Sequence, residues 1–222
     1  MERFGNRYQA ANLSRIPWLD HGFGTRHAGN WVDGQPGATL RQIHSAIVWR
    51  VTESSGCLGE GDSLITNRPG IWLSVRTADC VPVIVADQVR QAIGVAHAGW
   101  RGVANGVIDR TLERMQFHFG TAVGDLQIAI GPGIGLCCFE VGPEVARQFQ
   151  KIFPERADLH GKTCLDLTES LMRRMRKMGI AESQMEYGAP CTRCTPDEFH
   201  SYRRDGSAAG RMVSAASIRH TQ

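Results

Sequence analysis

The sequence predicts an α/β protein in which layered mixed β-sheets are flanked by helices within one compact domain. Short apolar runs suited to buried strands alternate irregularly with amphipathic segments suited to helices, which argues against a barrel. Hydrophobic residues make up 42% and charged residues 21% of the 222 residues, an ordinary balance for a folded domain. Neither a repeat nor a linker marks a boundary, so residues 1–222 are expected to form a single domain.

The first half of the chain is expected to contribute mainly strands. Residues 1–40 are rich in turns and lack a clear period, and 21–26 and 32–37 are expected to be loops. Residues 40–52 alternate enough for a strand. Residues 71–86 form the strongest apolar stretch, which Pro82 interrupts, so two short strands or one kinked strand are expected there. A buried strand that ends in small residues follows at 91–98.

The second half is expected to contribute the helices. Residues 105–119 and 166–178 keep their apolar side chains on one side of a helix, and Gly179 is a plausible end for the second. Pro143 near a first turn predicts another helix at 143–153. Strands are predicted at 126–130, 185–187 and 212–217, and a glycine-rich turn at 131–135 follows the first of them.

Composition limits the classes of partner. The formal net charge is +3, and all but three of the 25 Lys and Arg residues are Arg, whose planar fork suits carboxylate and phosphate. No basic block is interleaved with aromatic residues, so nucleic-acid binding is not expected. No apolar run of about 18 residues and no secretory pattern at the N-terminus is found, so no membrane is expected. Seven cysteines, an odd number, indicate reduced thiols in the cytoplasm rather than a disulfide framework.

Three residues, His44, Cys80 and His97, invite a metal site. Each lies at or just inside the end of an expected strand, where a sheet presents side chains to a shared cleft. Two imidazoles and a thiolate suit Zn²⁺ and leave a fourth position open. Spacing alone leaves other interpretations open, because single histidines are often structural and free cysteines are often small buried hydrophobes. The same residues also fit a Cys80 nucleophile with His97 as its base.

Three further features of the sequence are candidate sites. Cys191 and Cys194 match the second half of the zinc deaminase signature, but its His-x-Glu half is absent and no second Cys-x-x-Cys accompanies them. We therefore expect both to be structural or to line the cleft. The 131–135 turn lacks the spacing of a dinucleotide or Walker loop, although its backbone N–H groups remain suited to an anion. Arg101 beside His97 is a candidate anion ligand, with a surface ion pair as the alternative.

Together, the motifs of this chain resemble one known family in content and order. They include Gln42-Ile43-His44, Thr77-Ala78-Asp79-Cys80-Val81-Pro82, His97-Ala98-Gly99-Trp100-Arg101-Gly102 and Ser201-Tyr202-Arg203-Arg204-Asp205-Gly206. On these residues the chain is similar to the YfiH/YlmD family, long called laccase-domain or multicopper polyphenol oxidase proteins and also described as purine nucleoside phosphorylases. The resemblance covers about residues 20–218. The stretch between His21 and Leu40 looks shorter than is usual in that family.

The resemblance implies a fold, a metal and a reaction. The fold is a compact α/β protein with layered mixed sheets. The metal is a catalytic zinc ion on His44, Cys80 and His97. The reaction is phosphorolysis of adenosine, inosine and methylthioadenosine, together with deamination of adenosine. Substrate contacts are expected from Gln42 and Arg26.

The mechanism that follows from the resemblance gives roles to two more residues. Arg101 is expected to hold the phosphate dianion in phosphorolysis. Deamination needs a carboxylate that carries a proton, and Asp79 is the candidate because it adjoins Cys80; a structural turn is the equal alternative for Asp79. The catalytic set is thus Cys80, His97, Asp79 and Arg101. The expected partners are a purine nucleoside and phosphate, and the chain is expected to be a monomer.

Three rival functions stay open at this point. A copper polyphenol oxidase also uses two His and one Cys, but a multicopper enzyme needs more histidines in paired clusters than eight scattered ones provide. A cysteine amidase acting on a cell-wall peptide precursor would use Cys80 as nucleophile. A module that only binds a partner would fit the short N-terminal region.

Overall fold

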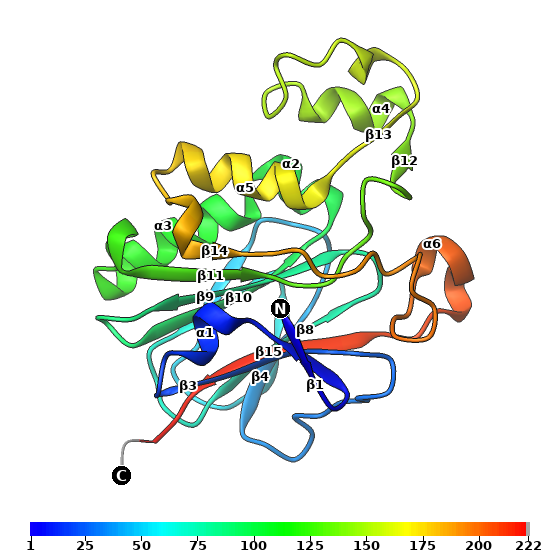
Figure 1. Ribbon diagram of the computed structural model, residues 1–222. Helices are drawn as coiled ribbons and strands as arrows, with labels where there is room; N and C mark the ends of the chain where they lie inside the picture. The colour runs from blue at the N-terminus through cyan, green and yellow to red at the C-terminus, as the bar shows by residue number, and fades with distance from the viewer. Residues whose placement is uncertain (221–222) are drawn as a thin grey trace.

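Two stacked β-sheets and a layer of helices form the molecule, as the computed structural model of residues 1–220 shows (Figure 1). The seven-stranded sheet has the order β1 (Glu2–Phe4), β2 (Arg7–Gln9), β3 (Leu19–Gly24), β15 (Met212–Ile218), β8 (Trp72–Thr77), β4 (Gly37–Arg41) and β6 (Gly56–Glu60). The six-stranded sheet has the order β14 (Met185–Glu186), β11 (Leu126–Ile130), β9 (Val81–Asp87), β10 (Ala92–Ala98), β7 (Ser63–Thr66) and β5 (Val48–Arg50).

The helices with the largest apolar faces are α3 (Val107–Phe119) and α5 (Leu167–Lys177), and the shorter ones are α1 (Ala11–Ser14), α2 (Trp100–Asn105), α4 (Pro143–Ala146) and α6 (Tyr202–Asp205). Three helices, α2, α3 and α5, lie on the outer face of the six-stranded sheet, whereas α1 packs into the core between the sheets, and α4 and α6 lie apart from that face (Figure 1). A small ribbon of β12 (Glu140–Val141) and β13 (Thr163–Cys164) stands beside α4. No helix among residues 1–220 has the length and apolarity needed to cross a bilayer.

The central strands read as unbroken apolar runs because both of their faces are covered. In β9, Val83 and Val85 pack under the helices, whereas Ile84 and Ala86 pack against the seven-stranded sheet. Side chains of a strand alternate between faces, so a strand buried on both sides is apolar at every position. The expected fold class, layered mixed sheets flanked by helices, is confirmed.

The long helices begin and end at residues whose side chain or backbone conformation favours a helix terminus. The carboxylate of Asp166 accepts the backbone N–H of Glu169 at 2.9 Å and so caps α5. The helix expected at 105–119 starts only at Val107, since Gly106 adopts a left-handed conformation (φ 82°) that ends α2 and starts α3. The helix expected at 143–153 is shorter than predicted: α4 ends at Ala146 and a 3₁₀ turn, Arg147–Phe149, follows.

Two expectations for the first half of the chain are wrong. The turn-rich start, 1–40, contains β1, β2, α1, β3 and most of β4, and β3 covers 21–24 of the loop expected at 21–26, because it pairs with β2 on one side and with β15, from the other end of the chain, on the other. The single strand expected at 40–52 is two strands, β4 and β5, which belong to different sheets. By contrast, 71–86 does form two strands, β8 and β9, again one in each sheet. Two of the connections at which the chain crosses between the sheets, at 42–47 and at 78–80, bear on the site described below.

Candidate active site

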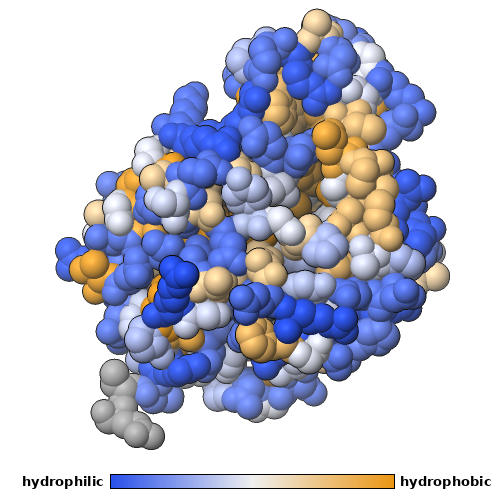
Figure 2. Space-filling model, viewed as in Figure 1, coloured by the Kyte–Doolittle hydropathy of each residue, from blue (hydrophilic) through white to orange (hydrophobic). Residues whose placement is uncertain are grey.

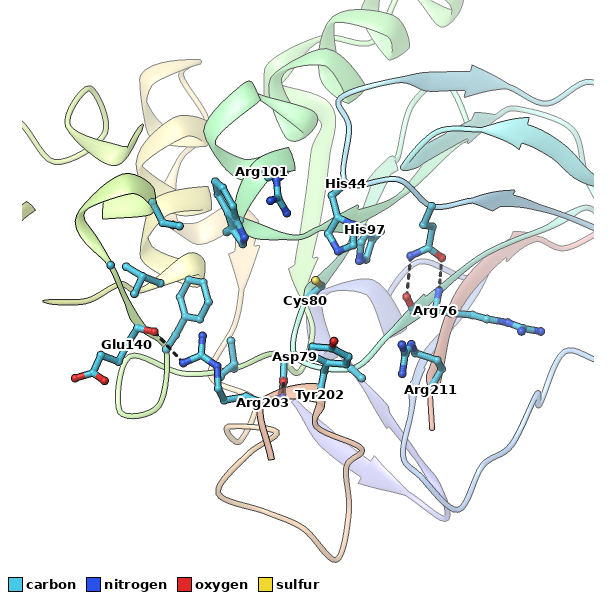
Figure 3. Close-up of a pocket in the computed structure, with 18 of the residues that line it drawn as sticks. His44, Arg76, Asp79, Cys80, His97, Arg101, Glu140, Tyr202, Arg203 and Arg211 are labelled. Atoms are coloured by element: carbon cyan, nitrogen blue, oxygen red, sulfur yellow. Dashed lines mark hydrogen bonds between the residues drawn. The ribbon is translucent and has the colours of Figure 1, made fainter. Parts of the chain in front are cut away.

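The structure brings together His44, Cys80 and His97, the three residues predicted as metal ligands (Figure 3). One ligand atom of each lies within 4.8 Å of the others, and the two imidazole rings are 4.9 Å apart between centroids. His44 lies on the crossing after β4, Cys80 on the crossing before β9, and His97 near the end of β10. Two nitrogens and one sulfur at these separations fit a tetrahedral zinc ion with one position left for a reactant.

Both crossings carry a residue in an uncommon backbone conformation. His44 has φ 60° and Asp79 has φ 83°, whereas most residues other than glycine avoid positive φ. Each such conformation costs about 1–3 kcal/mol and persists only where the surroundings enforce it. The contacts that enforce it are therefore part of the site.

The buried carboxylate of Asp62 is the contact that shapes the His44 turn. It accepts the backbone N–H groups of Ile43 (3.3 Å), His44 (3.0 Å) and Ser45 (2.5 Å), and also the Ser45 hydroxyl at 2.6 Å. The same carboxylate lies 2.8 Å from Nδ1 of His97. One side chain thus holds the backbone of one histidine and the ring of the other. With Nδ1 bound to a carboxylate, Nε2 of His97 is left free to bind a metal ion.

Electrostatics at the site favour a thiolate. Burial by itself raises the pKa of Cys80, but hydrogen bonds from His44 and His97 outweigh it and lower that pKa to about 7. Burial lowers the pKa of His97, yet its hydrogen bonds to Asp62 and Cys80 prevail and raise it to about 9. The pKa of Asp62 lies below its usual value, because the hydrogen bonds from His97 and Ser45 prevail over the opposing effect of burial. The thiolate is the form of cysteine that binds metal or attacks an electrophile.

The start of α2 packs tightly against the three ligands. A methyl group added to Gly99 would lie 2.5 Å from Cδ2 of His44 and 3.0 Å from Sγ of Cys80. Only glycine leaves room for both side chains at this point. The next two residues, Trp100 and Arg101, reach the neighbouring cavity, where the Arg101 guanidinium lies 4.3 Å from the centre of the Trp100 ring.

A cavity of about 880 Å³ opens in front of the ligands. This volume is within the range of small-molecule sites, roughly 300–1,000 Å³. The lining of the cavity combines an apolar part with guanidinium groups that lie at several places around it, Arg101 over the Trp100 ring and Arg203 over the Phe139 ring (Figure 3). The apolar part comprises Leu40, Trp100, Ile134, Phe139, Val141 and Val145, and the guanidinium groups belong to Arg76, Arg101, Arg203 and Arg211. In Figure 2, apolar surface gathers beneath the lobe that carries α4.

Of the three residues predicted to contact the substrate, two line the cavity and one does not. Gln42 lines the cavity, but its amide is bound at both ends to the backbone of Arg76, donating to the carbonyl and accepting from the N–H at 2.7 Å each. Arg101 lines the cavity, and among residues 1–220 no carboxylate pairs with its guanidinium. Arg26 does not line the cavity: its guanidinium donates to the carbonyl of Pro196 at 2.7 Å, on the loop before α6.

Asp79 lines the cavity, yet both of its carboxylate oxygens are already engaged. One accepts the hydroxyl of Thr192 and the other the backbone N–H of Arg203, each at 2.6 Å. These bonds tie the crossing at 78–80 to the two segments that precede and begin α6. The geometry therefore favours the structural alternative that the sequence left open for Asp79.

Sequence reasoning missed the roles of Asp62 and Thr192. Asp62 stands directly before β7 and Thr192 lies between two cysteines, and no local pattern assigns either a partner. The sequence offers no signal for Asp62, because its burial and its need for hydrogen-bond donors become visible only in the fold.

Comparison with known proteins adds relatives to this geometry. Residues 26–219 match the family described as multi-copper polyphenol oxidoreductase laccase. A purine nucleoside phosphorylase of Bacteroides thetaiotaomicron is 42% identical over 163 residues, which are 71% of this chain and 60% of that protein. An adenosine deaminase of an unknown prokaryotic organism is 34% identical over 170 residues, 74% of this chain and 64% of that protein. The chain thus spans less than two thirds of the length of both relatives.

Among solved structures, YlmD from Geobacillus stearothermophilus superposes with a TM-score of 0.88. The superposition covers 99% of this chain and 98% of that one, at 24% sequence identity. At this identity the likeness concerns the fold, and it agrees with the layered arrangement expected from the motifs.

Proposed function

The chain belongs to the laccase-domain family of multi-copper polyphenol oxidoreductases, and from that premise we propose that it is a zinc-dependent purine nucleoside phosphorylase that also deaminates adenosine. The expected substrates are adenosine, inosine and methylthioadenosine, and the expected metal ligands are His44, Cys80 and His97. Two of its relatives, a purine nucleoside phosphorylase and an adenosine deaminase, support this reaction class. We further propose that it acts in the cytoplasm, in keeping with its seven free cysteines, and as a monomer.

The observation that carries the proposal is the convergence of the three expected ligands on a cavity lined by both apolar side chains and guanidinium groups. A purine nucleoside has a flat apolar base, and its phosphorolysis needs a bound phosphate dianion beside the sugar. The base fits the apolar part of the lining, which includes Trp100 and Phe139, where aromatic faces can stack on it. The phosphate fits the guanidinium of Arg101, which has no carboxylate partner among residues 1–220.

In this arrangement the residues act mainly by positioning. Arg101 would hold phosphate so that one of its oxygens attacks C1′ of the ribose while the bond from C1′ to the base breaks. The base then leaves with the bonding electron pair and takes up a proton. His44, Cys80 and His97 would hold the zinc ion, which would supply Lewis-acid chemistry beside the bound substrate. The carboxylate of Asp62 would keep His97 oriented and Nε2 free for the metal.

Gln42 and Asp79 are proposed to shape the cavity rather than to touch the substrate. Gln42 joins the crossing at 42–47 to the end of β8 through its two bonds to Arg76. Asp79 joins the crossing at 78–80 to Thr192 and Arg203. Each crossing carries one metal ligand, so both side chains set the distance between His44 and Cys80.

A product assay tests the proposal directly. Zinc-loaded protein is incubated with adenosine, with and without inorganic phosphate, and the products are separated by chromatography. Adenine together with ribose 1-phosphate, formed only with phosphate, reports phosphorolysis, and inosine reports deamination. The proposal fails if zinc-loaded protein forms none of these products.

The variant Cys80→Ala tests the site, with Cys57→Ala as the matched control because Cys57 is an exposed cysteine on β6. We expect Cys80→Ala to bind one zinc ion per chain fewer than the wild type and to lose nucleoside turnover, while Cys57→Ala keeps the zinc content and turnover of the wild type. Unchanged zinc content together with full turnover in Cys80→Ala would refute the site. Turnover of phenols by copper-loaded protein, with no nucleoside turnover, would favour the oxidase instead.

A cysteine hydrolase is a second candidate, because one observation favours it. Cys80, His97 and Asp62 form a chain of nucleophile, base and orienting carboxylate, the arrangement that activates thiols in such enzymes. The two functions differ in what zinc does. If zinc protects Cys80 from alkylation and nucleoside turnover needs zinc, the phosphorylase is supported. If zinc only inhibits and metal-free protein hydrolyses an amide, the amidase is supported. Absence of metal uptake and of every turnover would leave a partner-binding module.

A further inference from the structure

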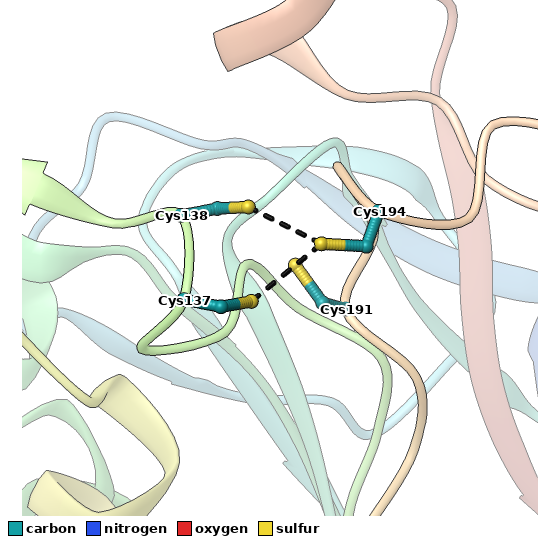
Figure 4. A group of neighbouring side chains, drawn as sticks. All are labelled: Cys137, Cys138, Cys191 and Cys194. Carbon is teal, nitrogen blue, oxygen red and sulfur yellow. Dashed lines mark hydrogen bonds between the residues drawn. The ribbon is translucent and has the colours of Figure 1, made fainter.

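Four thiols gather at a second place, outside the cavity (Figure 4). Cys137 and Cys138 lie on the loop after β11, and Cys191 and Cys194 on the loop after β14. The four sulfur atoms all lie within 4.8 Å of one another. Sγ of Cys194 is 3.3 Å from Sγ of Cys138 and 3.6 Å from Sγ of Cys137. The sequence provides a single Cys-x-x-Cys, as predicted, and the structure places a pair of adjacent cysteines, Cys137 and Cys138, beside it.

Ordinary packing does not account for this cluster. Free cysteines usually serve as small buried hydrophobes, yet Cys137 and Cys194 are exposed and their two companions are only partly buried. None of the four forms a disulfide. A single disulfide would also leave two of the thiols without a role. The four thiols are exposed or partly exposed and come from two loops that are far apart in the sequence. A common ligand would explain why they lie together.

The distances fit one metal ion. With zinc–sulfur bonds of ~2.3 Å, tetrahedral geometry sets the sulfur atoms ~3.8 Å apart. The observed spacings of 3.3 and 3.6 Å, within an overall limit of 4.8 Å, are close to that value. An iron–sulfur cluster binds its cysteines to several iron atoms and so needs them farther apart.

The surroundings also suit metal-bound thiolates. The backbone N–H of Gly135 donates to Sγ of Cys191 at 3.2 Å, a hydrogen bond that favours the ionised sulfur. A methyl group added to Gly135 would lie 3.2 Å from Cβ of Cys191 and 3.4 Å from Sγ of Cys137. The loop after β11 thus approaches the sulfur atoms as closely as its backbone allows.

We propose that Cys137, Cys138, Cys191 and Cys194 form a second metal site, which binds one zinc ion through four thiolates. Four protein ligands leave no open position, which is the arrangement of structural zinc sites rather than catalytic ones. The proposal does not rest on the proposed function, because its ligands are distinct from His44, Cys80 and His97.

The site would brace the wall of the active-site cavity. Phe139 and Glu140, which line the cavity, directly follow Cys138. Thr192, which holds Asp79 at 2.6 Å, directly follows Cys191. An ion that joins the two loops would therefore fix the position of two segments near Cys80. One lines the cavity with Phe139 and Glu140, and the other holds Asp79 through Thr192.

The test compares Cys194→Ser with Cys57→Ser, since Cys57 is also exposed but lies outside the cluster. Each protein is stripped of metal under reducing conditions, reloaded with Zn²⁺ or Co²⁺, and analysed for metal content and visible absorption. We expect Cys194→Ser to bind one ion per chain fewer than the wild type and to lose most of the sulfur-to-cobalt charge-transfer absorption. Cys57→Ser should match the wild type, and Cys80→Ala should keep the four-thiolate spectrum, so the two sites can fail separately.

A second measurement covers the case in which Cys194→Ser does not fold. Wild-type protein, with and without Zn²⁺, is treated with an alkylating agent, and labelled cysteines are identified by mass spectrometry. We expect zinc to protect the four clustered thiols while Cys57 reacts equally in both samples. The proposal is overturned if zinc protects none of them, if Cys194→Ser binds as many ions as the wild type, or if two of the four thiols form a disulfide in freshly reduced protein.

Discussion

The substitution Asp62→Asn is the sharpest test of how the site is assembled. The Asp62 carboxylate accepts four backbone or hydroxyl donors of the His44 turn and the ring nitrogen of His97. An asparagine replaces one acceptor oxygen with a donor NH₂ group. If that group takes the place of Oδ1, it faces the N–H of His44 and Nδ1 of His97. If it takes the place of Oδ2, it faces the N–H groups of Ile43 and Ser45.

In either orientation at least two donors lose their acceptor. A buried group left without its partner costs about 1–3 kcal/mol, so Asp62→Asn should lower the free energy of unfolding by about 2–6 kcal/mol. Loss of the partners that orient a metal ligand typically costs about 10–100-fold in metal affinity or activity. We therefore expect Zn²⁺ affinity, measured by competition with a chromophoric chelator, to fall by about 10–100-fold, or about 1.4–2.7 kcal/mol.

Asp87→Asn is the matched control. Asp87 is also fully buried, but only its Oδ1 accepts hydrogen bonds, from the N–H groups of Val89 and Arg90, while Oδ2 has no partner. An asparagine there can place its NH₂ group at the free position, so zinc affinity should stay unchanged. Ser45→Ala, which removes a single donor from Asp62, should have an intermediate effect. Zinc affinity of Asp62→Asn within twofold of the wild type would refute the role given to this carboxylate.

Three further predictions concern the site and the core. Gly99→Ala should lower zinc affinity at least tenfold, because the added methyl group meets two ligands at 2.5 and 3.0 Å; Gly124→Ala, which meets nothing within 4 Å, should not, and equal affinities would contradict the packing argument. Asp79→Asn should change phosphorolysis and deamination in parallel, as scored by chromatography, since asparagine can keep both hydrogen bonds; selective loss of deamination would instead make Asp79 a proton carrier. Burial lowers the pKa of His21 to about 4, against 6.5 in the unfolded chain, so its contribution to stability is complete above pH 6.5 and is lost as pH falls toward 4, by up to about 3 kcal/mol. Denaturant melts at pH 7 and pH 4.5 should therefore differ less for His21→Gln than for the wild type, and an equal difference would exclude His21 as the cause.

The parts of the fold that sequence reasoning predicted are those that local patterns determine. The stripes of α3 and α5 and the apolar runs of β9 and β10 follow from burial of one or both faces. The N-terminal strand β3 was missed because its pairing partners make it a strand, and the main one, β15, comes from the other end of the chain, with Phe23 opposite Ser214. The alternation of polar and apolar residues at 40–52 continues through His44 and so predicts a single strand. The backbone turns at His44 because its N–H is bound by Asp62, a residue that comes after the next two strands and lies outside the local pattern.

The same division applies to the candidate sites. The three ligands could be named because the motifs that carry them are distinctive in order, and the structure brings them together. Arg26 also belongs to a motif, yet it lies outside the cavity, since a motif identifies a residue without giving its direction. Cys137 and Cys138 escaped notice because adjacent cysteines do not resemble half of a zinc site, and their partners lie on a different loop.

Two of the three predicted metal ligands, His44 and Cys80, lie on loops at crossings between the two sheets, and this raises a physical problem. Loops have few ladder hydrogen bonds to fix them, whereas a metal site needs its ligands placed within a fraction of an ångström. Two side-chain contacts, each of which joins two segments, hold these loops in place. The Asp62 carboxylate joins the His44 turn to β10. The hydrogen bond from Thr192 to Asp79 joins the loop that carries Cys191 and Cys194 to the turn before Cys80. If the four cysteines hold an ion, the second contact rests on a rigid base, and the geometry of the first metal site then depends in part on occupancy of the second.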